Sequence, residues 1–155
     1  MSSFRITHAS VSNLQHTDQP FGFDYSFESD HYAKNAGGML LVRPRVLGNK
    51  AFGYLETKEP RRFSIEFEGP ARDVDTFEIA IPAGYEVDDT PPPADADFSF
   101  ASYHSKTEVG VIRYTRTFEV KQLSLPVDRA DELKRFDRAI MGDERSTVVL
   151  KAVAR

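Results

Sequence analysis

Histidines are the residues of this chain best suited to bind a metal or to transfer a proton. The chain has four of them, namely His8, His16, His31 and His104. None forms an H-x-H or H-x-x-x-H pair, the short spacings that bring two ligands to one ion. A metal site would need ligands from distant strands. We therefore interpret the four histidines as structural residues, exposed or half-buried.

Aspartates could bind calcium where several of them meet in one loop. Four of them flank a run of three prolines: Asp88, Asp89, Asp95 and Asp97. Three consecutive prolines form a stiff, extended spacer that holds the two acidic pairs apart. The stretch also lacks the glycine that a tightly wrapped calcium loop needs. The sequence favours a solvated, acidic, proline-rich loop over Asp88–Asp97.

Nucleophilic catalysis has few candidate residues. The chain has no cysteine and no G-x-S-x-G motif. Ser102 and Ser105 lie close to His104, but residues adjacent in sequence rarely face one another. Paired carboxylates for glycoside cleavage would come from different strands, and 24 acidic residues single out none of them. We predict no catalytic, cofactor-binding or metal-binding residue, and no cofactor.

Aromatic and basic residues could also form a binding surface. A platform for sugars or peptides would use four tyrosines: Tyr32, Tyr54, Tyr85 and Tyr103. Packing in the core or at its rim is the favoured interpretation of these tyrosines. Arg113 and Arg116 fall on opposite faces of one predicted strand, so they form no patch. Arg61 and Arg62 are predicted to be exposed.

The strand around which the fold is predicted to form lies at residues 77–87. Phe77, Ile79 and Ile81 alternate with polar or small residues, which indicates a half-buried strand. Pro82 ends it, and Gly84 permits a turn before Tyr85 and Val87 point inward. We expect an inner strand of a sheet that packs on a second layer.

Further strands are predicted by the same alternation over residues 4–14, 21–27, 39–42, 62–68, 98–103, 108–125 and 146–153. In the second of them, Phe21, Phe23, Tyr25 and Phe27 point one way. The strand at 39–42 is apolar throughout, so we expect it to be covered on both sides. Residues 15–20 and 104–107 are predicted turns, and Gly110 is a candidate bulge.

Two segments leave alternatives open. Residues 45–62 could hold a hairpin around Gly48 and Asn49, or a short helix over residues 50–57. Residues 29–38 are a connection that could include a helical turn at residues 31–35.

One helix is predicted, from Arg129 to Met141. Its apolar stripe has helical spacing and consists of Leu133, Phe136 and Ile140. Asp128 is the predicted N-cap, Asp131 holds the capping-box position, and Gly142 is the predicted C-cap. The fold class is therefore all-β: one domain over residues 1–155, an antiparallel β-sandwich of about eight strands with one α-helix near the C-terminus.

Composition limits the function classes. The net charge of −4 argues against nucleic acid as a partner, since phosphates need a basic surface. No apolar run approaches the roughly 20 residues of a membrane span, so we expect no membrane insertion by this segment. The first residues lack a signal-peptide pattern. We expect either a cytoplasmic protein or an internal piece of a longer one.

The order of several short segments carries the only functional indication. These are Tyr25–Phe27, Gly38–Pro44, Arg61–Ile65, Ile81–Val87, Ile112–Arg116, Leu133–Asp137 and Val148–Lys151. Together they resemble the C-terminal all-β domain of unknown function that follows the transglutaminase-like domain in large bacterial exported proteins. The most specific part is the Pro-x-Gly-Tyr corner, followed by the long strand with two arginines. None of the segments is a catalytic motif.

The resemblance implies a non-catalytic accessory module in the periplasm or cell envelope, as part of a larger exported protein. Its partner would be the upstream transglutaminase-like domain of the same polypeptide, on which it would dock or which it would orient. The Cys-His-Asp centre of such proteins would lie upstream. The alternatives are an independent binding module for cell-wall glycan or peptide, and an enzyme in its own right.

Overall fold

The computed structural model describes residues 4–53 and 61–153. By its internal contacts the chain separates into two compact units, residues 1–34 and residues 35–155. The first unit contains β1 (Arg5–Ser12) and β2 (Gly22–Glu28). The remaining elements are β3 (Lys34–Ala36), β4 (Met39–Val42), β5 (Ile65–Glu66), β6 (Ala71–Ile79), β7 (Tyr85–Asp89), β8 (Ala94–Asp97), β9 (Ala101–Glu108), β10 (Ile112–Val120), β11 (Ser124–Leu125), a 3₁₀ turn (Val127–Arg129), α1 (Ala130–Arg145) and β12 (Val148–Ala152).

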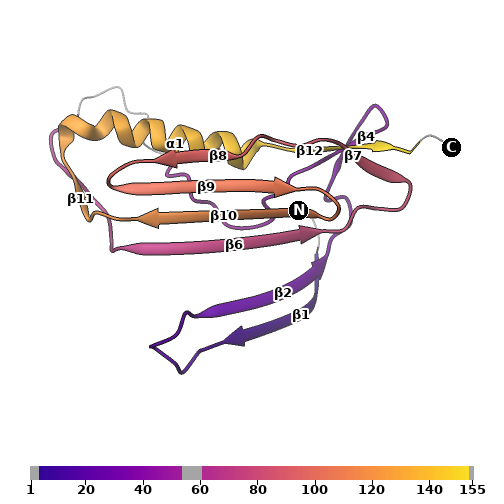
Figure 1. Cartoon of the computed structure of the whole chain (residues 1–155), viewed down its shortest axis with the longest axis horizontal. Helices are drawn as coiled ribbons and strands as arrows, with labels where there is room; N and C mark the ends of the chain where they lie inside the picture. Colours follow the sequence, from indigo (N-terminus) through magenta and orange to yellow (C-terminus); the bar gives the residue numbers. More distant parts are fainter. Residues whose placement is uncertain (1–3, 54–60, 154–155) are drawn as a thin grey trace. The chain divides into compact units, whose positions relative to one another are not determined.

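The first unit is a β-hairpin. Strands β1 and β2 pair antiparallel, with Arg5 opposite Glu28 at one end and Ser12 opposite Gly22 at the other (Figure 1). The predicted polar turn at residues 15–20 connects them, which confirms that prediction. The side-chain amide of Asn13 donates to the carbonyl oxygen of Pro20 at 2.7 Å and holds this loop closed.

The second unit is built on a four-stranded antiparallel sheet with the strand order β6-β10-β9-β8 (Figure 1). The alternation of the sequence predicts that the apolar residues of β10 share one face and most of its polar residues the other, and the structure confirms it. Ile112, Tyr114, Phe118 and Val120 are buried on one side. The predicted strand over 108–125 was too long, because a turn at residues 109–111 separates β9 from β10. Gly110 lies in that turn with φ of 120° and forms no bulge.

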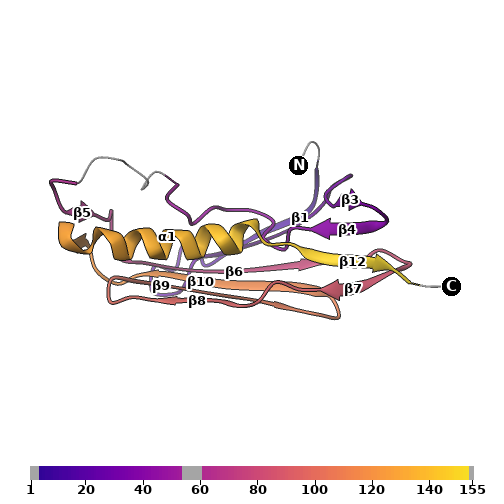
Figure 2. The same cartoon turned by 90° about the horizontal axis from the view of Figure 1, so that it is seen from above.

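Helix α1 covers the inner face of this sheet (Figure 2). Its predicted stripe is confirmed, since Leu133, Phe136 and Ile140 are fully buried. Phe136 packs edge-on against the ring of Phe100, with 5.7 Å between ring centroids, and contacts Phe118 at 6.2 Å. The centre of the core is therefore aromatic.

The predicted ends of the helix are wrong. Residues 127–129 form a 3₁₀ turn, and no side chain caps the start of α1 at Ala130. Gly142 lies inside the helix, which continues to Arg145. The last turn carries Asp143 and Glu144, which hydrogen-bond to other elements. These tertiary bonds stabilise the helix beyond the residue that local preference marks as its end.

A second sheet has the order β3-β4-β12-β7. The last strand is confirmed, with Val148 and Leu150 buried on one face of β12. Strand β4 is also confirmed in its bounds. It is covered only in part, because Val42 is buried whereas Met39 is 41% exposed.

Several predicted elements differ from the structure. Strand β6 is an edge strand of its sheet and not an inner one, because the chain passes through Pro82 and Gly84 into β7 of the other sheet. Of the predicted strand 62–68, only residues 65–66 form a strand, which pairs with the two-residue β11, and the backbone N–H of Phe67 donates to the carbonyl oxygen of Leu123 at 2.8 Å. Phe63 is 82% exposed as a result.

The segment before β9 was also predicted incorrectly. Strand β9 starts at Ala101 and runs through the predicted turn at residues 104–107. Phe98 and Phe100 precede it, and both turn their rings onto Phe136 of the helix, with centroid distances of 5.8 and 5.7 Å. Packing on the helix replaces the strand alternation expected from the sequence.

Of the two open segments, the described part of the first is irregular up to residue 53, and the second contains a short strand. Residues 45–53 contain neither strand nor helix, and Gly48 turns with φ of 71°. The rest of the alternative helix at 50–57 lies outside the described residues. Strand β3 occupies residues 34–36, where a helical turn was considered, and His31 has a φ of 58°.

The predicted fold class is confirmed: the chain is all-β and sandwich-like, with antiparallel sheets and one helix near the C-terminus. The structure adds two short strands that were not predicted, β3 and β8. In the described ranges, no helix has the length and apolar character that crossing a membrane requires.

Candidate functional site

The hairpin of the first unit has one apolar face and one polar face. Residues directly opposite each other in an antiparallel pair share a face. The register therefore places Val11 with Phe23, and Ile6 with Phe27. On the other face, Arg5 forms an ion pair with Glu28 at 2.5 Å.

The apolar face is a row of aromatic rings along β2. The rings of Phe23 and Tyr25 lie 5.5 Å apart at 17°, and those of Tyr25 and Phe27 lie 6.0 Å apart at 15°. Phe21 continues the row, 6.3 Å from Phe23, and Phe4 packs edge-on against Phe27 at 5.9 Å. We define the aromatic face as Phe4, Ile6, Val11, Phe21, Phe23, Tyr25 and Phe27.

Most of this aromatic face is exposed to solvent, whereas Tyr25 and Phe27 are half-buried. Phe21 and Phe23 are each 61% exposed, and Ile6 is 58% exposed. Apolar residues scattered singly on a surface are ordinary, but a contiguous apolar patch indicates a contact surface. A two-stranded hairpin is also only marginally stable by itself in water. The sequence predicted that four aromatics of β2 point one way, and the structure confirms it.

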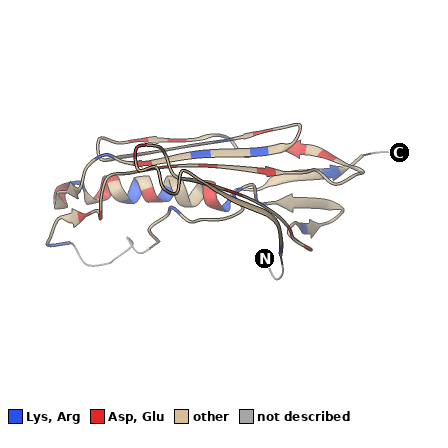
Figure 3. Ribbon diagram, turned by 90° about the horizontal axis from the view of Figure 1, so that it is seen from below, with Lys and Arg blue, Asp and Glu red and all other residues tan. Residues whose placement is uncertain are grey.

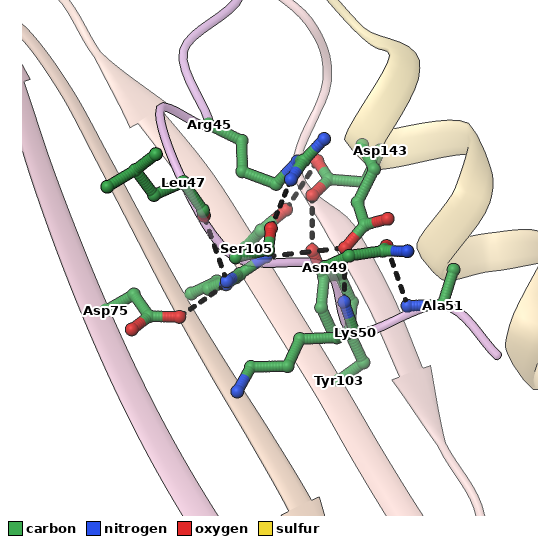
Figure 4. Close-up of polar contacts among 12 residues, drawn as sticks. Arg45, Leu47, Asn49, Lys50, Ala51, Asp75, Tyr103, Ser105 and Asp143 are labelled. Carbon is green, nitrogen blue, oxygen red and sulfur yellow. Dashed lines mark hydrogen bonds and ion pairs between the residues drawn. The ribbon is translucent and has the colours of Figure 1, made fainter.

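A cluster of polar side chains is buried in the second unit, and sequence analysis did not find it. The carboxylate of Asp143 accepts hydrogen bonds from the hydroxyls of Tyr103 at 2.5 Å, Tyr114 at 2.6 Å and Ser105 at 2.7 Å (Figure 4). Burial, together with the hydrogen bonds to Asp143, raises the pKa of both tyrosines well above its ordinary value. The cluster joins α1 to β9 and β10.

This cluster does not assemble a nucleophile with a base. Ser105 points inward to Asp143, whereas the Nδ1 atom of His104 lies 2.8 Å from a carboxylate oxygen of Asp95 on the outer face. Ser102 bonds Glu119 at 3.5 Å. The structure therefore separates His104 from Ser105, its neighbour in sequence.

Arg116 is the second buried polar centre. Its Nε donates to Asp75 at 2.6 Å, and its Nη1 lies 3.4 Å from the carboxylate of Glu144. Burial by itself would lower the pKa of the Arg116 guanidinium, but the hydrogen bond and the charge of Asp75 raise it. Arg113 pairs with Glu78 on the outer face at 2.6 Å. The prediction that the two arginines lie on opposite faces is confirmed.

Arg116 and Glu144 also hydrogen-bond to the backbone of the irregular segment at residues 45–53. The backbone N–H of Lys50 donates to Glu144 at 2.6 Å, and the carbonyl oxygen of Leu47 accepts from Arg116 at 3.4 Å. The backbone N–H of Phe52 donates to Asp137 of α1 at 2.6 Å. Acidic and basic residues are interspersed along α1 (Figure 3), and two of its buried acids, Asp137 and Glu144, accept from backbone N–H groups.

The acidic residues near the prolines are paired with bases. Asp88 lies 2.9 Å from the Nζ of Lys151, and Asp97 lies 2.7 Å from that of Lys121. The hydrogen bond from Lys121 lowers the pKa of Asp97 below its ordinary value. The predicted loop over 88–97 is wrong, because β7 and β8 occupy most of it. Among the described residues, no group of three or more potential ligands gathers to hold a metal ion.

The other candidates are dispersed. His8, His16, His31 and His104 are all exposed. Tyr103 is fully buried, Tyr32 and Tyr85 are half-buried, and Tyr54 lies outside the described residues. Tyr103 therefore cannot be part of a surface platform. Arg62 is exposed as predicted, whereas Arg61 is half-buried.

The position of Arg116 in the sequence indicates a buried polar site. Arg116 follows Tyr114 and precedes Phe118 at the spacing of a single strand face. A charged residue in that buried register requires a buried partner. The identity of its partners is not visible in the sequence, because Asp75 and Glu144 lie 41 and 28 residues away.

Comparison with known proteins gives one family. Residues 38–150 match the family described as a domain of unknown function with a solved structure, DUF3858. No curated protein and no solved structure matches the chain. The match covers most of the second unit and does not include the hairpin. The chain belongs to the DUF3858 family.

Proposed function

We propose that this chain is a non-catalytic accessory module that docks on a neighbouring domain through the aromatic face of its hairpin. The single observation that carries this proposal is the contiguous row of rings along the hairpin, in which Phe4, Phe21 and Phe23 are more than half exposed. Its burial against a partner would remove apolar area from water, which is the main favourable term in protein association. The polar face opposite would remain solvated.

The partner that we propose is the transglutaminase-like domain expected upstream in the same polypeptide. The resemblance of the segments between Tyr25 and Lys151 supports this choice. The module would work in the bacterial cell envelope. Its role would be to orient the catalytic domain or to extend its substrate cleft.

A glycan platform fits the aromatic face less well. Sugars stack on the open face of an aromatic ring, as flat ligands do. Rings only 5.5 Å apart and inclined by 17° are stacked on one another, because two rings side by side in one plane would collide at that distance. Phe23 and Tyr25 therefore turn their faces toward each other and their edges toward solvent.

The test is an amide NMR titration of the labelled chain with the upstream catalytic domain, expressed separately. We expect shifts at the aromatic face, including Ile6, Val11 and Phe23, and little change in α1. Phe23→Ser should weaken the interaction, whereas Asp24→Ala, on the polar face of the same strand, should leave it unchanged.

Two results would contradict the proposal. Shifts confined to the second unit would mean that docking uses another surface. The absence of shifts at concentrations of about 1 mM, where even weak complexes form, would mean that the aromatic face does not bind this domain. Cell-wall glycan fragments would then be titrated as the alternative ligands.

A further inference from the structure

The two edges of the four-stranded sheet are differently protected. An exposed edge presents unpaired N–H and C=O groups to any other strand, and proteins protect such edges by shortness, proline, bulges or charge. Strand β8 has four residues and directly follows three prolines. Strand β6 has nine residues, contains no proline, and pairs with β10 without a register shift (Figure 1). Of these four kinds of protection it has only charge, at Arg72, Asp73, Asp75 and Glu78.

Among the strands that the structure describes, only β10 pairs with β6. Within these strands, the second edge of β6 has no paired neighbour. Adding a strand to such an edge is a common mode of protein recognition, in which backbone hydrogen bonds supply affinity and side-chain pairs supply specificity. The side chains of β6 decide which strand fits.

The outer face of β6 carries a pattern that complements itself. Arg72, Val74, Thr76 and Glu78 alternate along this face, and all four are exposed. If a second β6 lies antiparallel with Asp75 opposite its own copy, Arg72 faces Glu78 and Val74 faces Thr76. Each of these pairs occurs twice by symmetry. Opposite charges directly across an antiparallel pair are stabilising.

This register also suits the backbone. It pairs each even-numbered residue with an even-numbered one and each odd-numbered residue with an odd-numbered one. Along an edge strand, alternate residues point their N–H and C=O groups outward. Outward-pointing groups of one copy therefore meet outward-pointing groups of the other. This register also places Asp75 opposite Asp75 of the second copy. The negative charge of each carboxylate is balanced by Arg116 of the same copy, 2.6 Å away.

We infer that β6 pairs, edge to edge and antiparallel, with β6 of a second copy of this chain. The result is a twofold-symmetric dimer with one continuous sheet across both copies. The contact uses a surface other than the aromatic face, so it is independent of the proposed docking function.

The first test is sedimentation equilibrium of the full chain up to about 1 mM, the range in which weak interfaces form. Arg72→Glu places two pairs of like charges in the dimer and should weaken it about tenfold. Glu78→Arg should do the same. The double variant restores opposite charges at both positions and should recover the dimer to within about threefold of the original affinity.

Thermal unfolding of each variant separates this effect from lost stability. Arg72 faces Glu119 and Glu78 pairs with Arg113 inside one copy. The stability costs of the two substitutions should therefore add in the double variant, while dimerisation recovers. Glu108→Arg is the matched control, because Glu108 faces Arg113 from the inner strand β9. It should leave the dimer unchanged.

Disulfide trapping tests the register. The chain has no cysteine, so Val74→Cys and Thr76→Cys each introduce a single thiol. Residues opposite each other lie about 4.5–5.5 Å apart between Cα atoms, within the reach of a disulfide. An equal mixture of the two variants should cross-link well, and each variant alone should cross-link poorly.

Three results would overturn the inference. One is a chain that stays monomeric at the highest concentration. Another is a double variant that dimerises no better than the weaker single variant. The third is a dimer that Phe23→Ser disrupts and Arg72→Glu does not, because the second copy would then occupy the aromatic face of the hairpin.

Discussion

Strands β2 and β10 carry the same kind of pattern and have opposite surroundings. Both alternate between two faces, and the aromatic residues of each strand lie on one of them. In β10, Tyr114 and Phe118 lie beneath α1 and are almost completely buried. In β2, Phe23 is 61% exposed and Tyr25 and Phe27 are half-buried, and Phe21, directly before the strand, is also 61% exposed. Alternation therefore specifies which residues share a face, but it does not specify whether another layer covers that face.

The largest expected effect comes from making the same substitution in the two regions. Phe136→Ala removes a fully buried ring that contacts Phe100 and Phe118, and should lower the free energy of unfolding by about 3–5 kcal/mol. Phe23→Ala removes an exposed ring and should leave the second unit unchanged. Chemical denaturation of both variants measures the difference. Equal losses would mean that the aromatic face is part of the core.

A smaller effect is expected for the buried carboxylate. Asp143→Ala leaves the hydroxyls of Tyr103, Tyr114 and Ser105 without their acceptor. The cost should be about 3 kcal/mol, since buried unsatisfied donors are expensive. Asp97→Ala removes an exposed acid of an ion pair and should not change stability measurably. A stable Asp143→Ala variant would show that the tyrosine pair alone satisfies the cluster.

Alkaline pH should act on the same cluster. The pKa values of Tyr103 and Tyr114 are raised from the ordinary 10.0 by burial and by their bonds to Asp143. Their stabilising contribution is therefore complete below pH 10, and it decreases as the pH rises above 10. The loss should be about 1.4 kcal/mol per pH unit for each tyrosine. A pH titration should follow the ultraviolet absorbance of tyrosinate together with the unfolding of the chain. We expect two tyrosines to ionise only as the chain unfolds.

The smallest change in stability is expected on the hairpin. Phe23→Ser should cost less than about 1 kcal/mol, because a single cross-strand pair is worth little. It should nevertheless reduce the fluorescence of an apolar dye that binds exposed hydrophobic surface. Ser10→Ala, on the polar face, is the control. Unchanged dye binding would mean that the aromatic face is not accessible in solution.

Local features were predictable in both units. The faces of β10 and the stripe of α1 followed from spacing, and both are confirmed. The aromatic face was predicted as one side of a strand. The failures share a cause, since each depends on a distant partner. Gly142 continues the helix because Asp143 and Glu144 have tertiary bonds, and Phe98 leaves the strand pattern because it packs on Phe136.

The sequence by itself determined the all-β class, the strand faces and the single amphipathic helix. Side-chain direction repeats every two residues in a strand and about every 3.6 in a helix, so neighbouring residues contain that information. The tertiary structure alone decided that β6 lies at an edge, that α1 covers β10, and that Asp143 meets Tyr103, 40 residues away in sequence. Such pairings depend on which distant segments pack together, and the periodicity of neighbouring residues does not determine that.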